Sequence, residues 1–434
     1  MRKFFAIVLT MLLAISLLAG CGGGGGGSGS GGGASPDSIA PKDTAVSGAV
    51  SVLWHGGLNQ TNKVQEVVQE QFNAIYPDVT VEFTEVTATE IGEKCMLEVA
   101  SKSGAYDVAM QYQSIPALVN LSGLFPLDEY IARDEFPIED MIDNGIRYKD
   151  KIYGLPMRGD VRVLHYNEDH FIAAGLDPDK PPVGMEQYEE YSRILTRDGI
   201  FGVNRRFSED CFVAILYEYG GDLLDENYEP VFNGEAGYKA VDLMKRQYAE
   251  GLVDPMATGW QNNDEIAAYM SGAAAMYEGW PARYIEATQP ERSQIVGKSR
   301  VAPLAGENAL IGGWYNVILS DGKNHEAAWK LIEFIASPGA QKEVILRGGD
   351  CNPTHKDVFF DPELQEKYEV LRAVGESFDK AKAFPQSTQI NAIRALFNTY
   401  LPPAVYENAD IQKALDDCAD EVRQMLVDAG ELES

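Results

Sequence analysis

The alternation of strand and helix patterns between residues 49 and 113 constrains the fold most strongly. The segment AVSVLWHGG is typical of a buried strand that ends at glycines, and Thr61 to Tyr76 carries apolar residues at helical spacing before Pro77. VTVEFTEV then alternates as a strand, residues 90–103 have a helical pattern, and YDVAMQ is a third strand. Strands that alternate with helices predict a parallel sheet in an α/β domain.

The ends of the first and third of these strands predict a binding site. In an open α/β sheet, ligands bind beyond the carboxyl ends of the strands. Trp54 and His55 end the first strand, while Gln111 and Gln113 flank Tyr112 after the third. We therefore expect the indole, imidazole and amide side chains of these residues to contact a ligand.

A second set of elements follows the segment KIYGLPMRGDVRVLHYN. Helical patterns cover residues 236–250, 263–271 and 326–336, while AAAMYEG and WYNVILS have the composition of strands. From Ser387 the pattern predicts a helical tail in two pieces, broken at the Pro-Pro pair at 402–403. With 434 residues in all, the chain is long enough for two lobes.

The N-terminus has the layout of a secretion signal. Arg2 and Lys3 precede an uncharged apolar run that is too short to predict a membrane span. The Leu-Ala-Gly-Cys sequence that ends this run resembles the bacterial lipobox, which implies a signal peptide at 1–20 and lipidation of Cys21. The same resemblance predicts that residues 21–45, which are Gly/Ser-rich, serve as a flexible tether to the membrane. The alternative is an ordinary signal peptide with an incidental cysteine.

The charge and the cysteines exclude some classes of partner and site. The chain has 36 Lys and Arg against 66 Asp and Glu, a net charge of −30, so we expect no nucleic acid partner. Four cysteines remain after the N-terminal segment, with no CxxC pair: Cys95, Cys211, Cys351 and Cys418. Up to two disulfides and buried free thiols are equal alternatives for them.

No catalytic or metal-binding motif is complete. HEAAW begins like a zinc-protease motif, but Trp329 stands where the second histidine must be. GKS at 297–299 lacks the preceding glycine of a phosphate-binding loop, and no GxSxG is present. The five histidines are scattered singly, so we expect no metal, no cofactor and no catalytic residue. Paired carboxylates among so many acids leave a glycosidase mechanism open.

Four longer segments carry the functional signal. KIYGLP, VLHYNEDHFIAAGLDPDKPP, SGAAAMYEGW and GGWYNVILSDGKNHEAAWKLIEFIASPGAQ occur in this order at domain-scale spacing. Together they closely resemble the extracellular solute-binding proteins of ABC importers, in particular the sugar-binding group that includes maltodextrin-binding proteins. The resemblance extends from about Val50 to Met425.

This resemblance implies a two-lobed, periplasmic-binding-protein-like α/β fold of the interdigitated type II, with a hinge and a central cleft. By this likeness the first lobe comprises 47–157 and 310–355, and the second comprises 162–305 and 356–434. The resemblance also implies a monomer that captures a mono- or oligosaccharide outside the cytoplasm. Such a protein delivers its ligand to the membrane subunits of an ABC permease.

The resemblance extends the list of candidate ligand contacts. Trp280 matches the family position whose aromatic ring stacks on sugar, with a core tryptophan as the alternative. Asp160 matches an acidic family position, or makes only a hinge ion pair, and Asp210 matches a polar cleft position. Trp54 and Trp314 adjoin glycines at strand ends, where a ring can reach the cleft.

The sequence is also compatible with other functions. A polyamine-binding protein needs acids that pair with ammonium groups, and the candidates are Asp160, Asp210, Glu278 and Asp350. A surface-anchored enzyme that degrades polysaccharides and a binding protein that serves a sensor kinase are the further alternatives. Gln111 stands where the maltodextrin binders have an aromatic residue, which departs from the maltodextrin pattern but not from the sugar class.

Overall fold

The computed structural model describes residues 46–112, 115–142 and 145–433. The predicted signal peptide, Cys21, the tether and Gln113 lie outside these residues. Within the described chain, no helix is both long and apolar enough to cross a membrane.

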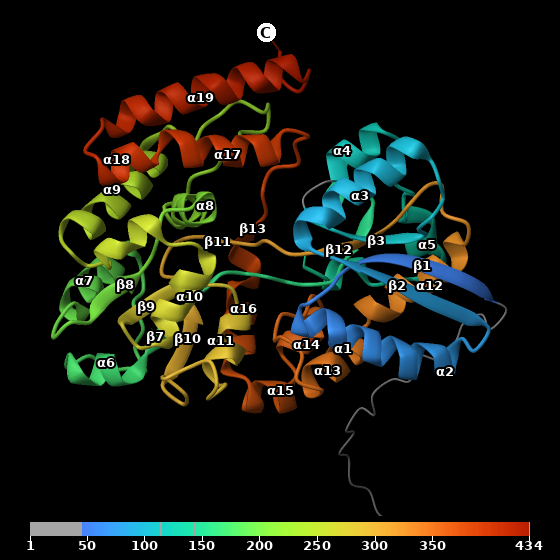
Figure 1. The fold of residues 1–434 in the computed structure, drawn as a ribbon, viewed down its shortest axis with the longest axis horizontal. Coiled ribbons are helices and arrows are strands. Elements are labelled where there is room, and N and C mark those ends of the chain that lie inside the picture. The colour runs from blue at the N-terminus through green and yellow to red at the C-terminus, as the bar shows by residue number, and fades with distance from the viewer. Residues whose placement is uncertain (1–45, 113–114, 143–144, 434) are drawn as a thin grey trace, which may run out of the picture. The chain divides into compact units, whose positions relative to one another are not determined.

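A five-stranded sheet forms the first lobe (Figure 1). Its strand order is β2-β1-β3-β12-β6. The bounds are β1 (Gly48–His55), β2 (Val79–Val86), β3 (Val108–Gln111), β6 (Gly154–Pro156) and β12 (Tyr315–Ile318). β1 pairs in parallel with β2 and β3, but β12 runs antiparallel to both β3 and β6. The sheet is therefore mixed, and the prediction of a parallel sheet is correct only for the strands at the N-terminal end.

The helices of the first lobe agree with the apolar spacing in the sequence. The predicted helix that starts near Thr61 continues to Ile75 through a π-helical turn and ends before Pro77, whose ring cannot continue a helix. Thr87 and Glu90 form a capping box at the start of the next helix. The elements are α1 (Asn59–Val67), α2 (Asn73–Ile75), α3 (Ala88–Ser101), α4 (Ile115–Asn120), α5 (Asp128–Asp134), β4 (Arg147–Tyr148), β5 (Lys151–Ile152), α12 (His325–Ala336) and α13 (Pro338–Leu346).

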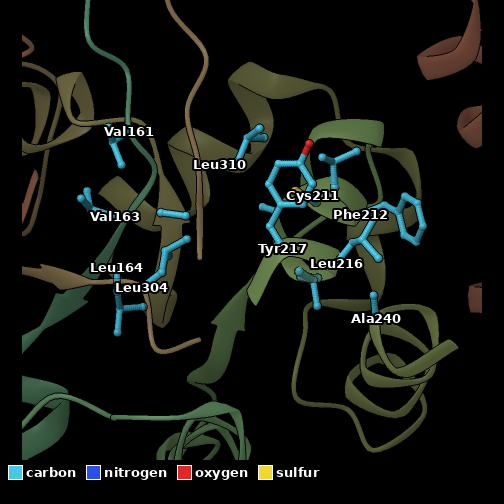
Figure 2. Packing of buried hydrophobic residues seen from close by; sticks show 14 of the residues in the cluster. Val161, Val163, Leu164, Cys211, Phe212, Leu216, Tyr217, Ala240, Leu304 and Leu310 are labelled. Carbon is cyan, nitrogen blue, oxygen red and sulfur yellow. The ribbon is translucent and has the colours of Figure 1, made fainter. Parts of the chain in front are cut away.

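A four-stranded sheet forms the second lobe, in the order β10-β7-β9-β8. Its strands are β7 (Val163–Asn167), β8 (Phe201–Asn204), β9 (Ala274–Gly279) and β10 (Ser299–Pro303). Two further short strands, β11 (Ala309–Leu310) and β13 (Ala381–Lys382), pair in parallel. Figure 2 shows side chains of the buried cluster of this lobe, which includes Val163 of β7 and Phe212 of α8 (Glu209–Glu218).

The helices of the second lobe include two that the sequence predicts within one residue at each end. Residues 236–250 correspond to α9 (Glu235–Ala249), and 263–271 correspond to α10 (Asn262–Met270). The other helices are α6 (Glu168–Ala173), α7 (Met185–Leu195), α8 (Glu209–Glu218), α11 (Ala282–Ala287), α14 (Lys356–Phe359), α15 (Pro362–Lys367), α16 (Glu369–Ser377), α17 (Ile390–Tyr400), α18 (Pro402–Tyr406) and α19 (Ile411–Asp428).

The tail differs from the two-piece prediction, because it forms three helices. Pro402 starts α18 instead of only ending α17, since a proline in the first turn of a helix loses no hydrogen bond. The additional break lies after Tyr406, where Asn408 has a φ of 65° and Asp410 caps α19. Asparagine tolerates this left-handed conformation better than most residues.

Each lobe has its own buried apolar cluster. One cluster surrounds the five-stranded sheet and contains Trp54 and Trp329, both fully buried. The other contains the core of β7, α8 and α9, together with much of the tail. Ile142, whose neighbours in the sequence belong to the first lobe, packs in the second cluster. The two-lobed α/β fold agrees with the expectation, whereas the individual lobe boundaries stay a prediction.

Candidate functional site

Segments that connect the two sheets pair with one another. Val161 and Ile311 form an antiparallel bridge, and the Gly312 amide donates a hydrogen bond to the Asp160 carbonyl over 2.9 Å. The Gly159 amide donates to the Asn352 carbonyl of a further connection over 3.0 Å. Residues that flank an antiparallel bridge on opposite strands share a face, so Asp160 and Gly312 lie on the same side of these connections.

Aromatic side chains from both lobes converge at Gly312. The His55 ring lies edge-on to Trp314, with ring centroids 4.9 Å apart, and Trp314 lies 5.4 Å from Tyr112. A Cβ at Gly312 would lie 3.1 Å from Cη2 of Trp280 and 3.4 Å from the Tyr112 hydroxyl. We call His55, Trp314, Tyr112 and Trp280 the aromatic row.

Three members of the aromatic row are more exposed than the core tryptophans. Trp280, Trp314 and Tyr112 are half-buried, whereas Trp54 and Trp329 are fully buried. Burial, followed by the nearby Arg158 charge, lowers the pKa of His55, which favours the neutral imidazole at pH 7. Its Nδ1 is buried without a hydrogen-bond partner among the described residues. The row therefore offers partly exposed aromatic rings at the connections between the lobes.

Charged groups from the connecting segments adjoin the row. The Asn352 amide donates to Oδ1 of Asp160 over 2.6 Å, and Arg158 lies 3.5 Å from the carboxylates of both Asp160 and Asp350. Burial raises the pKa of Asp350, while the Arg158 charge opposes that rise. Asp160 therefore makes the hinge ion pair that the sequence allowed, on the same side of the connections as the aromatic row.

A second charged group comes from the C-terminal helices of the second lobe. Arg394 on α17 forms ion pairs with Asp210 at 2.7 Å and with Glu209 at 3.3 Å, at the start of α8. Its guanidinium carbon lies 4.8 Å from the Phe384 ring centroid and 6.0 Å from that of Tyr112. Burial, followed by the Asp210 charge, raises the pKa of the Tyr112 hydroxyl, which therefore stays protonated. This arrangement joins Asp210 to the aromatic row through Arg394.

Two residues predicted for the site do not belong to the aromatic row. The Trp54 ring packs edge-on against Phe83 in the first-lobe core, because successive side chains of β1 point to opposite faces and only His55 points to Trp314. Gln111 is 1% exposed, and its amide donates to the Met110 carbonyl of the same strand over 2.9 Å. Neither side chain belongs to the aromatic row, and their assignment as ligand contacts stays a prediction, as does that of Gln113.

Two residues of this arrangement were absent from the predicted contacts. Tyr112 appeared in the sequence only as the residue between two favoured glutamines, and strand alternation could have selected it over Gln111. Arg394 lies far along the chain in an amphipathic helix, and no sequence motif indicates that this helix packs beside α8. Only the tertiary fold brings Arg394 to Asp210.

The other candidate features of the described residues are metal ligands, cysteines and a cavity. They contain no group of three or more His, Cys, Asp or Glu side chains placed to hold a metal. The four cysteines are free and buried, which decides between the two alternatives for them. A cavity of about 800 Å³ lies between the β4-β5 hairpin and residues near the C-terminus, and no member of the aromatic row lines it.

The chain belongs to the family of bacterial extracellular solute-binding proteins, whose model matches residues 57–342. It is 25% identical, over 66% of this chain and 68% of the relative, to a probable amino-acid ABC transporter periplasmic-binding protein of Sinorhizobium fredii. It is 26% identical to the galactooligosaccharide-binding protein of Bacillus subtilis, over 64% of this chain and 66% of that protein. The structure of maltose-bound MalE3 from T. maritima covers 87% of this chain and is covered completely, with a TM-score of 0.74 and 24% identity.

Proposed function

We propose that this protein binds a neutral carbohydrate between its two lobes. The observation that carries the proposal is the aromatic row, which brings rings from both lobes to Gly312. Aromatic faces cover the apolar C–H faces of a sugar, while carboxylates and amides bind its hydroxyl groups. Asp160 and Asn352 supply such groups beside the row. The galactooligosaccharide-binding relative supports the same class of ligand.

The charge pairing disfavours a cationic solute such as a polyamine. All four acids that were candidates for binding ammonium groups already have an arginine partner. The pairs are Asp160 and Asp350 with Arg158, Asp210 with Arg394, and Glu278 with Arg205. A cationic ligand has to compete with these guanidinium groups, whereas a neutral sugar can bind to the pairs as they stand.

A sugar that contacts both lobes binds the closed arrangement more tightly than the open one, and this difference shifts the population toward closure. The family membership supports a role in solute import, in which an ABC permease receives the sugar. In this proposal the protein acts outside the cytoplasm as a monomer that is held to the membrane by a lipid on Cys21. The chemistry of ATP hydrolysis belongs to other subunits, and this chain only binds.

A thermal-shift screen tests the proposal. The chain from Ala34 onward is screened against galactooligosaccharide, arabinooligosaccharide, maltotriose and mannitol, with amino acids and polyamines as the contrasting panel. A ligand at 100 times its dissociation constant adds about 2.7 kcal/mol to the free energy of unfolding, which is a clear rise in melting temperature. A rise with amino acids or polyamines alone, or turnover of an added glycan, contradicts the proposal.

A further inference from the structure

Arg162 is a buried arginine that forms no ion pair with a carboxylate in the part of the chain that the structure describes. Its side chain comes from the first connecting segment and is 4% exposed. No described carboxylate forms an ion pair with it, whereas the neighbouring Arg205 pairs with Glu278 at 2.6 Å. A guanidinium that is removed from water without an ion pair is costly, so its remaining contacts indicate what it does.

The contacts of Arg162 lead to Trp280. Nη2 of Arg162 donates to the Glu278 carbonyl, two residues before Trp280, over 2.6 Å. The guanidinium carbon lies 5.3 Å from the centroid of the Trp280 ring, within the range of a cation–π interaction. The backbone amide of Arg162 donates to the Leu310 carbonyl over 3.0 Å, which fixes the residue to the second connection.

Two other contacts restrict the same indole. The outer edge of the ring lies close to Gly312, where no side chain intervenes. His165 contacts the Trp280 carbonyl through Nε2 at 3.2 Å, which holds the backbone at the base of the side chain. His165 therefore contacts the Trp280 backbone, Gly312 adjoins the outer edge of the indole, and Arg162 contacts the ring itself.

We propose that Arg162 is a positioning residue that holds the Trp280 ring in the orientation needed to stack on the ligand. This inference rests on the proposed function, since it assigns Trp280 to sugar contact. A planar guanidinium covers an aromatic ring better than an ammonium does, so lysine replaces arginine only in part. Arg162 acts through Trp280 and does not itself contact the sugar.

A double-mutant cycle on sugar affinity tests this assignment. The probe is the panel sugar with the largest thermal shift, titrated into wild type, Arg162→Met, Trp280→Leu and the double variant. We expect Arg162→Met to weaken binding about tenfold in the wild-type background and less than twofold beside Trp280→Leu, because residues that act together are not additive. We expect Arg162→Lys to recover part of the affinity. An equal loss in both backgrounds overturns the proposal.

A control variant and a measurement without ligand distinguish an effect on the Trp280 ring from a general loss of stability. Arg206→Met removes another arginine of the same lobe, which pairs with Glu265 at 3.5 Å, and should lower stability without changing sugar affinity. The near-UV circular dichroism of Trp280 is the difference between the spectra of wild type and Trp280→Leu. In the Arg162→Met background it is the difference between Arg162→Met and the double variant. We expect these two difference spectra, recorded without ligand, to differ. An unchanged Trp280 contribution overturns the proposal, even where Trp280→Leu binds too weakly to titrate. If Trp280→Leu binds sugar normally, the proposed function fails first.

Discussion

The two lobes supply different surfaces to the same site. On the first lobe, Trp314 contacts both His55 and Tyr112, and all three residues lie at strand ends of one sheet. On the second lobe, Trp280 and Asp210 are each held by an arginine from a distant segment. The difference shows that one face depends on local strand order, whereas the other depends on buried charges that the fold must bring together.

The largest expected effect is on the second-lobe face. Trp280→Ala should weaken sugar binding about 100-fold, or about 2.7 kcal/mol, because it removes the ring that adjoins both Gly312 and Arg162. Isothermal titration calorimetry measures this change. Trp260→Ala is the control, since Trp260 packs against the second-lobe core and should affect stability alone. Equal affinity losses in both variants would count against a specific role for Trp280.

The first-lobe face should be less sensitive to the loss of one ring. Trp314→Ala should weaken binding about tenfold, or about 1.4 kcal/mol, because His55 and Tyr112 still supply part of the surface. The same titration measures it, with Trp54→Phe as a control in the core of the same lobe. A larger loss for Trp314→Ala than for Trp280→Ala would reverse the comparison between the faces.

The two faces are closely packed where they meet at Gly312. Gly312→Ala places a methyl group 3.1 Å from the Trp280 ring and 3.4 Å from the Tyr112 hydroxyl, which is tight for a carbon contact. We expect binding to weaken about fivefold, or about 1 kcal/mol, as the two rings move apart. Gly259→Ala, where nothing lies within 4 Å of the added Cβ, is the matched control. Unchanged affinity in Gly312→Ala would show that the rings need not meet there.

The smallest effect concerns pH and the second lobe alone. Burial lowers the pKa of His165 from 6.5 to about 3, so the unfolded chain binds a proton below pH 6.5 that the folded chain does not. This residue should lower the free energy of unfolding by about 0.8 kcal/mol between pH 7.5 and pH 6, and further toward pH 3. Urea unfolding at both pH values, compared between wild type and His165→Gln, measures it. An identical pH dependence in the variant would refute this.

The sequence predicts regular elements better than it predicts the site. Helices such as α9 and α12 have strong apolar periodicity and adopt nearly the expected bounds. The antiparallel placement of β12 could not be predicted from local pattern. In the sequence, β12 follows all four strands of the second sheet, yet it pairs in the first sheet. The residues of β12 also do not indicate that the strand pairs with β3 and β6.

The candidate site illustrates the same limit with single residues. Trp54 and His55 are adjacent, and their opposite directions on β1 decide that one is core and the other joins the aromatic row. Trp280 and Asp160 came from resemblance to a family and lie together at the connections. Arg162 and Arg394 gain their roles only through tertiary contacts, so no spacing in the sequence identifies them.

In the proposed function, both lobes recognise the sugar at once. The most direct test is calorimetric titration of the sugar found in the thermal-shift screen into Trp280→Ala, Trp314→Ala and the double variant, each first shown to be folded by circular dichroism. We expect weaker binding in each single variant and no detectable binding in the double variant. Binding of wild-type strength in the folded double variant would contradict it.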